Sequence, residues 1–328
     1  MQRSAAIIDQ EQPVRVLTAF LRSGNSPHAL LFTGIHGVGK TAAAFRFAMA
    51  LNCRELPASM DGPCGQCPHC RKIESGSHPD IIYIQPDGAL IRIARIRELL
   101  AMLTMRPYEA KKRVVIISDA QAMNTEAGNA LLKVLEEPPD RTILILTTDQ
   151  AADLLPTIVS RCQRIRFRPL SRFRIEQLLI DRERLSRKDA EVISAMAGGS
   201  YLNAEKMSRT DWLARRNRLI RELDSLAEKP VGLLLALAEK LASEKEALAD
   251  ALAVMRVWFR DLLVARYVPE RIANEDWKDR IQKYAQAFTI DSLMSKIRLI
   301  QDTQKNISAN ANTRLALEAM IVKLSRNE

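Results

Sequence analysis

The chain has 328 residues, 47% of them apolar and 27% charged, which is the composition of a soluble globular protein with two or three domains. It has no run of 18 apolar residues and no signal-peptide pattern at its start, so we expect a cytoplasmic protein and neither a membrane-spanning nor a secreted one. The formal net charge of +10 predicts an anionic partner, either nucleic acid or an acidic protein surface.

The first half of the chain alternates apolar runs with helical patterns. Strands that alternate with helices predict a parallel sheet with both faces covered, and hence an α/β domain over residues 1–169. The expected strands are 30–32, 81–84, 114–117, 143–146 and 164–168, and the expected helices are about 13–23, 42–51, 91–103 and 125–135.

The first strand leads into the phosphate-loop pattern G-x-x-x-x-G-K-T at residues 34–41. Gly34, Gly37 and Gly39 allow a tight turn in which backbone N–H groups face a phosphate, at the positive end of the following helix. Lys40 would reach the β- and γ-phosphates, and the Thr41 hydroxyl would bind Mg²⁺. The alternative is a Gly-rich turn without a ligand, so the pattern predicts ATP or ADP binding but leaves hydrolysis open.

Four cysteines follow the phosphate-loop helix, at Cys53, Cys64, Cys67 and Cys70. Two successive C-x₂-C steps place thiolates close enough to share one tetrahedral Zn²⁺, and the earlier cysteine completes a closed site. A site with four sulfur ligands has no open position for water, so a structural zinc module is predicted at 53–70. Cys162 is remote in the sequence and is expected to be a small buried residue.

The third apolar run ends in Asp119, which fits the acid that holds the Mg²⁺ shell of a phosphate-loop protein. Its alternative role is a helix or turn cap. Ala120 occupies the position where a hydrolysing enzyme usually has a second carboxylate that orients the attacking water. Thr147 or Thr148, at the end of the fourth strand, is expected to lie near the γ-phosphate, and Ile7 and Ile8 are candidates for an adenine pocket.

Strand patterns end near residue 170, and helices follow, interrupted at 198–200 and at 229–230. Amphipathic patterns at 235–256 and 315–324 predict packing and assembly helices. The segment 161–188 contains ten Lys and Arg residues but only three Asp and Glu residues. Within this segment Arg164, Arg166 and Arg168 alternate with apolar residues, which predicts either a surface for nucleic acid or a solvated edge strand.

Several motifs together resemble those of the clamp-loader subunits of bacterial DNA polymerase III, in the AAA+ class. The resemblance extends over the whole chain. It rests on the four cysteines, the His-Pro-Asp at 78–80, the Leu-Leu-Lys-Val-Leu-Glu-Glu-Pro-Pro run at 131–139, the Ser-Arg-Cys at 160–162 and the segment 311–318.

The resemblance implies a hetero-pentameric ring that opens a sliding clamp and places it on primed DNA, with ATP bound at subunit boundaries. It implies an AAA+ domain at 1–169, a helical lid at 170–228 and an all-α collar for oligomerisation at 229–328. Arg161 would then be an arginine finger, a catalytic residue acting in trans on the ATP of the neighbouring subunit. Without the resemblance, Arg161 is an ordinary arginine at a helix C-terminus.

Two departures from the motor subunits of that ring favour a non-motor subunit, or stator, with weak or no ATPase activity of its own. Ala120 replaces a glutamate, and Leu202 replaces the sensor arginine of the lid. The intact phosphate loop favours the alternative, an ATP-hydrolysing motor subunit of the same loader. A third hypothesis is a zinc-dependent nucleic-acid-binding module that uses the cysteine loop and the basic strand.

Overall fold

The computed structural model describes residues 9–55 and 62–326, and these form two compact units. The first unit extends to Ser171 and includes Gly199–Leu202, and the second contains Arg172–Gly198 and the residues from Asn203 onward. Within the described ranges, no helix is both long and apolar enough to cross a bilayer.

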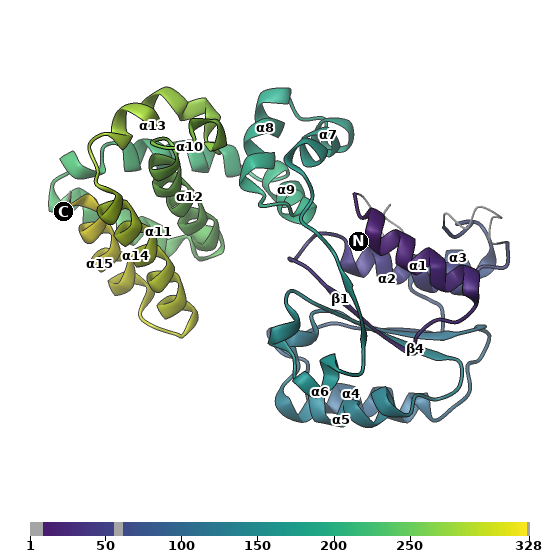
Figure 1. Ribbon diagram of the computed structural model, residues 1–328. Helices are drawn as coiled ribbons and strands as arrows, with labels where there is room; N and C mark the ends of the chain where they lie inside the picture. The colour runs from purple at the N-terminus through teal and green to yellow at the C-terminus, as the bar shows by residue number, and fades with distance from the viewer. Residues whose placement is uncertain (1–8, 56–61, 327–328) are drawn as a thin grey trace. The chain divides into compact units, whose positions relative to one another are not determined.

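The first unit contains a five-stranded, all-parallel sheet with the order β2-β3-β4-β1-β5, which confirms the predicted fold class (Figure 1). β1, which leads into the phosphate loop, lies between β4 and the edge strand β5. The strands are β1 Ala29–Thr33, β2 Ile81–Ile84, β3 Arg113–Ile117, β4 Thr142–Thr148 and β5 Gln163–Arg166.

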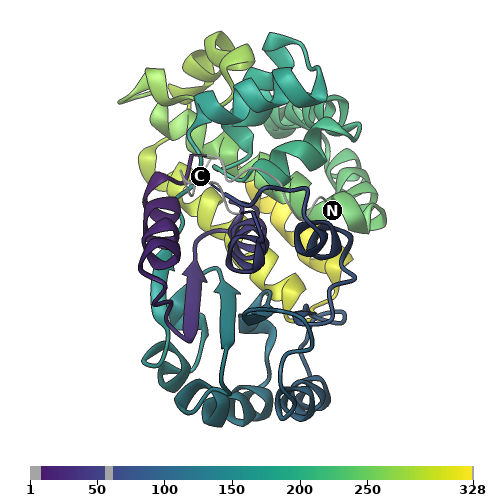
Figure 2. The same ribbon diagram turned by 90° about the vertical axis from the view of Figure 1, so that its right-hand side faces the viewer.

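Helices cover both faces of the sheet, as the continuous apolar strands require (Figures 1 and 2). Leu30 and Phe32 point to the face covered by α1 and α2, whereas Leu31 packs in the opposite core with residues of α4 and α5. This alternation follows from the two-residue period of a strand. The helices are α1 Glu11–Ser23, α2 Lys40–Asn52, α3 Pro68–Ser75, α4 Ile93–Leu103, α5 Thr125–Glu136 and α6 Pro156–Val159, with 3₁₀ turns η1 Ala120–Ala122 and η2 Ala151–Asp153.

The second unit is helical, as the loss of strand patterns after residue 170 predicted. One expected element was wrong: the pattern at 235–256 is not a single helix, because the chain leaves the helical conformation at Glu244. The helices are α7 Arg172–Glu183, α8 Arg187–Met196, α9 Tyr201–Ser208, α10 Trp212–Asp224, α11 Val231–Ser243, α12 Lys245–Val264, α13 Lys278–Ala285, α14 Ile290–Ser308 and α15 Thr313–Ser325. The 3₁₀ turns are η3 Leu226–Glu228, η4 Pro269–Arg271 and η5 Glu275–Trp277.

A buried arginine joins α10 to the C-terminal helices. Arg216 is 2% exposed, and its guanidinium donates to both carboxylate oxygens of Asp276, at 2.7 and 2.8 Å. Such a two-pronged charge pair is strong and directional. α10 also packs against α12, so it is structurally continuous with the helices that follow. The division into a lid at 170–228 and a collar at 229–328 stays a prediction.

Candidate nucleotide and metal sites

The phosphate loop lies at the carboxyl end of β1, where ligands of open parallel sheets bind. Gly39 ends the loop at φ 98°, a left-handed conformation that favours glycine. Gly37 adopts φ 81°, and a Cβ atom there would lie 2.2 Å from the Oγ of Ser200. The loop is thus shaped as predicted, with the segment 199–202 packed against it. Ile7 and Ile8, the candidates for the adenine pocket, lie outside the described residues.

The Lys40 side chain is turned into its own loop and is 5% exposed. Its ammonium group donates to the carbonyl oxygens of Gly34 and Ile35, and to Asp149 Oδ1 at 2.8 Å. The charge that would face a phosphate is therefore neutralised by a carboxylate. The sequence analysis did not single out Asp149. Its position in the sequence, directly after the fourth apolar run, could have indicated this role, because β4 ends beside β1 in the parallel sheet.

The residue that contacts the Thr41 hydroxyl is Ser118, with 3.4 Å between the two Oγ atoms. The assignment of position 120 to the water-orienting carboxylate of hydrolysing enzymes was wrong. The Ala120 side chain is 0% exposed and packs in the core beneath the sheet, so it does not face the phosphate loop. Ser118 is thus the residue of this segment that faces Thr41, and the Asp119 carboxylate comes one position later.

Asp119 adopts φ 51°, and this left-handed turn directs the following residue into the core. Its backbone N–H donates to Thr147 Oγ1 at 3.1 Å, and its carboxylate lies 3.9 Å from His36 Nδ1. Atoms of His36, Asp119 and Asp149 that could bind a metal all lie within 4.8 Å of one another. Two carboxylates at the mouth of the loop repel a triphosphate unless a cation neutralises them.

Thr147 and Thr148, the two candidate sensor residues, are both 0% exposed. Thr147 accepts the bond from Asp119, whereas Thr148 donates to the Gln150 carbonyl at 3.1 Å. Of the two threonines, Thr147 is therefore the one connected to Asp119. At the other side of the loop, the Leu202 backbone N–H donates to the Gly37 carbonyl at 3.4 Å. An apolar side chain thus occupies the position where the resemblance implies a sensor arginine in motor subunits.

The four predicted cysteine ligands converge at the end of α2 and the start of α3. All four Sγ atoms lie within 4.8 Å of one another, and Cys64 Sγ is 3.9 Å from Cys70 Sγ. Tetrahedral bonds of about 2.3 Å to zinc separate two sulfur atoms by roughly 3.8 Å, so the set fits a closed Cys₄ site. Each of the five cysteines, Cys162 included, is free of disulfides.

The environment of the cluster favours thiolate formation at one cysteine. Burial opposes ionisation of Cys67, but backbone N–H groups of Arg54 and Cys70 and neighbouring thiols outweigh it and lower its pKa to about 6. Burial raises the pKa of Cys53 and of Cys70. A metal cation at the centre would supply the charge that ionises these buried thiols. Cys162 is remote from the cluster, and burial raises its pKa to about 11.

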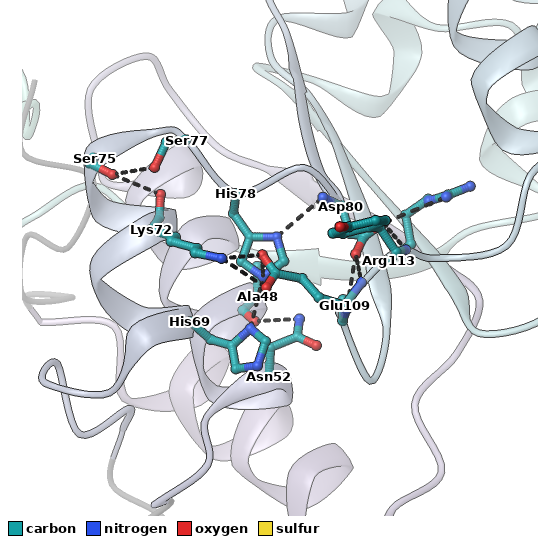
Figure 3. Close-up of polar contacts among 12 residues, drawn as sticks. Ala48, Asn52, His69, Lys72, Ser75, Ser77, His78, Asp80, Glu109 and Arg113 are labelled. Atoms are coloured by element: carbon teal, nitrogen blue, oxygen red, sulfur yellow. Dashed lines mark hydrogen bonds and ion pairs between the residues drawn. The ribbon is translucent and has the colours of Figure 1, made fainter.

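A pair of buried histidines fastens the cysteine helix α3 to the sheet (Figure 3). The backbone N–H of Asp80 donates to His78 Nδ1 at 3.2 Å, so a neutral His78 carries its proton on Nε2. That Nε2 group lies 2.9 Å from His69 Nδ1 and donates to it. Burial lowers the pKa of His78, which favours its neutral form. The His-Pro-Asp motif therefore positions the helix that carries Cys70.

The Asp80 carboxylate organises the loop between α4 and β3 (Figure 3). It accepts the backbone N–H groups of Tyr108, Glu109 and Ala110 at 2.8, 2.8 and 2.9 Å, and it lies 3.6 Å from the Arg113 guanidinium. Burial opposes its ionisation, yet these bonds and Arg113 lower its pKa. These contacts fix the backbone of residues 108–110 to Asp80.

Replacing Asp80 with Ala should lower the free energy of unfolding by about 3 kcal/mol, because Arg113 and three N–H groups lose their partner. Since the folded-state pKa is depressed, the stabilisation is complete above the unfolded-state pKa of about 3.9 and is lost as the pH falls below it. Denaturant titrations at several pH values measure both effects. Asp87→Ala, at an exposed aspartate of the same segment, is the control and should change stability little. If both variants lose the same free energy of unfolding, the proposed role of Asp80 is contradicted.

Arg161 follows α6 at the surface, and its side chain is 34% exposed. The guanidinium forms an ion pair with Glu136 and donates to the Thr157 carbonyl at 3.0 Å. No part of the phosphate loop described above is among its partners. The arrangement leaves the charged end accessible, which a residue acting on another subunit requires.

The basic segment after Arg161 begins with the edge strand β5, which was one of the two predictions for it, but the strand ends at Arg166 and not at the predicted Arg168. Ile165 and Phe167 are buried, whereas Arg164, Arg166 and Arg168 are exposed. One face of this strand is therefore apolar and the other basic. Positive charge on an edge also discourages pairing with another strand.

The chain is similar in sequence to known proteins over most of its length. Residues 9–171 match the family model described as DNA polymerase III, delta subunit, and residues 210–326 match the one described as DNA polymerase III, delta subunit, C terminal. "DNA polymerase III subunit delta'" of Bacillus subtilis (strain 168) is 31% identical over 320 residues, which are 96% of this chain and 96% of that protein. The protein of the same description from Pseudomonas aeruginosa is 32% identical over 90% of this chain and 91% of its own.

Proteins with other descriptions are also similar. "DNA polymerase III subunit tau" of Bacillus subtilis (strain 168) is 28% identical over 98% of this chain, which corresponds to 61% of that longer protein. Among solved structures, a gamma subunit-related protein of Thermotoga maritima aligns over 96% of this chain and 99% of its own, with 19% identity and a TM-score of 0.42.

Proposed function

Because the chain belongs to the family of DNA polymerase III subunit delta', we propose that it is the non-motor subunit, or stator, of the clamp-loader complex. In this role it assists the ATP-dependent loading of the sliding clamp onto primed DNA. Its direct partners are the other subunits of a hetero-pentameric ring, and it meets the clamp and the DNA through that assembly. It binds ATP or ADP weakly and hydrolyses it little.

The observation that carries the stator proposal is the Thr41–Ser118 contact. A hydroxyl stands where a carboxylate would complete the Mg²⁺ shell, so the metal that bridges and neutralises the phosphates is held poorly. Leu202 beside Gly37 provides no positive charge for the γ-phosphate. Lys40 is in addition engaged by Asp149. Each feature weakens either the binding of a triphosphate or the stabilisation of its transition state.

The nucleotide site that we propose consists of the loop glycines, Lys40, Thr41 and Asp119. Arg161 is proposed to act on the ATP of the neighbouring subunit, where its charge stabilises the transferring phosphoryl group. The proposed domains are an AAA+ domain at 1–169, a lid at 170–228 and a collar at 229–328. The boundary between lid and collar is the least supported of these, because the packing of α10 and the family match from residue 210 both favour a boundary before α10 and not at 228.

The metal that we propose for the four cysteines is a structural Zn²⁺. Thiolate sulfur is the preferred ligand of zinc in closed tetrahedral sites, and four sulfur ligands fill the coordination sphere. The ion would hold α3 against the end of α2 and would take no part in ATP chemistry.

Steady-state ATP turnover by the purified chain, measured with primed DNA, tests the stator proposal. Turnover should stay near background and should not change in Lys40→Ala. The alternative is an ATP-hydrolysing motor subunit, for which Asp119 would be the water-orienting carboxylate. Robust turnover that disappears in Lys40→Ala, and also in Asp119→Asn, would establish that alternative.

Replacing Asp149 with Asn should tighten ATP binding by about tenfold. The change frees Lys40 for the phosphates and removes one of the two carboxylates that repel them. Titration with a fluorescent ATP analogue measures the affinity. Asp140→Asn removes an exposed charge from the loop before β4 and should leave the affinity unchanged. Unaltered or weaker binding by Asp149→Asn would show that the ion pair does not restrict the site.

A further inference from the structure

One cavity among the described residues lies within the helical unit, remote in sequence from the phosphate loop. It has a volume of about 380 Å³ and is lined by residues of α10, α11 and α12 and of the turn before α11. This volume is within the usual range of ligand pockets. α10 and α11 each pack against α12 (Figure 1), and residues of these three helices line the cavity as a groove.

The inner surface of the groove is apolar. Buried side chains of Trp212, Leu219, Leu237 and Val254 contribute to it. Leu233 stands at its edge and is 56% exposed. An exposed leucine beside a buried apolar surface is characteristic of a site that receives apolar side chains of a partner.

The rim of the groove carries an excess of positive charge that no neighbour neutralises. Arg215, Arg218 and Lys240 line the cavity, and among the described residues no hydrogen bond or ion pair is formed by their side chains. Of the acidic lining residues, Glu222 is paired with Lys229 and Asp250 lies 3.8 Å from Lys206. Glu244 is the one acidic side chain of the lining without such a partner. The lining therefore has three unpaired basic side chains and one unpaired acidic side chain, an excess of positive charge that an acidic partner would neutralise.

We propose that this groove binds an acidic amphipathic helix of a partner protein. A groove walled by two helices accepts the ridge of a third, with apolar residues at i, i+4 and i+7 directed to its base. Carboxylates on the flanks of that ridge would meet the guanidinium and ammonium groups of the rim. The apolar base supplies affinity, and the charges supply orientation and a faster association rate.

Fluorescence anisotropy of a synthetic peptide, titrated with the full-length chain, tests the proposal. The peptide is about five helical turns long, with leucines at i, i+4 and i+7 and glutamates beside them. One comparison peptide has the same composition in scrambled order, and another has lysines in place of the glutamates. The acidic amphipathic peptide should bind at least about tenfold more tightly than either, and added salt should weaken its binding.

Two pairs of variants locate the binding on the chain. Leu233→Glu should weaken binding by about tenfold or more, whereas Val231→Glu, at a position 60% exposed on the same helix but outside the groove, should not. Arg218→Glu should likewise weaken binding, and Arg221→Glu, at an exposed arginine of α10 outside the lining, should not. These side chains lie at the surface, so unfolding midpoints should be unchanged.

Several results would overturn the proposal. Equal binding of the scrambled peptide would show that the apolar pattern is not recognised. Equal binding of the lysine peptide would show that the negative charge is not recognised. Equal effects of Leu233→Glu and Val231→Glu would place any binding elsewhere. If light scattering shows a dimer that Leu233→Glu converts to a monomer, the occupant is a second copy of this chain and not an acidic helix.

Discussion

Arg161→Ala is expected to slow ATP hydrolysis at the neighbouring subunit's site by about three orders of magnitude, while the variant itself folds and binds nucleotide normally. The loss arises because the guanidinium charge stabilises the phosphoryl group only in the transition state. Its own contacts here are a surface ion pair with Glu136 and one bond to a carbonyl, which contribute little to stability. Single-turnover hydrolysis by the reconstituted ring measures the effect.

Arg166→Ala is the matched control for Arg161→Ala. Arg166 is an exposed arginine of β5, five positions away, and should be replaceable without a change in rate. Glu136→Ala releases the Arg161 side chain without removing it, and hydrolysis should change by less than about tenfold. Unchanged single-turnover rates in Arg161→Ala would refute the arginine finger.

Cys70→Ser is expected to abolish zinc binding and to lower the melting temperature by about 10 °C or more. Cys70 is 0% exposed, and it packs with Phe45 and Ile73 in the core on the α2 side of the sheet. Loss of the metal would therefore leave buried thiols without their cation and would loosen the contact of α3 with that core. Elemental analysis of the purified chain, followed by thermal unfolding with and without a strong chelator, measures both effects.

Cys162→Ser is the control for the zinc prediction, because Cys162 is free and lies outside the cluster. This variant should retain one zinc ion per chain, and the chelator should lower its melting temperature as much as it lowers that of the unmodified chain. If the unmodified chain carries no zinc and the chelator leaves its melting temperature unchanged, the four cysteines are not a structural metal site.

The strands were predictable because their apolar runs are long and are bounded by turn residues. β2 covers the predicted residues, and β4 is longer than expected because β-branched threonines extend both of its ends. The break at Glu244 was not predictable in this way. It contains neither glycine nor proline, and the apolar period continues across it.

The four cysteines and the phosphate loop were found from the sequence because their spacing along the chain encodes the geometry. Asp119 was predicted to lie in the Mg²⁺ shell beside Thr41, but the residue in contact with Thr41 is Ser118. Asp119 adopts a left-handed conformation, and Ala120 after it enters the core. The pairing of Lys40 with Asp149 joins residues 109 positions apart, and it depends on β1 and β4 being neighbours.

Arg161 lies two residues before the edge strand β5, and this place affects how motion could reach it. Gln163, two residues further on, begins β5 and lies in register near Leu30 of β1, the strand that continues into the phosphate loop. A shift of that loop would therefore be transmitted to the backbone beside Arg161 across one pair of hydrogen-bonded strands. In this chain Lys40 binds carbonyl oxygens of its own loop and Asp149, so the loop is held in one conformation. Arg161 would then keep its position while the other subunits change shape.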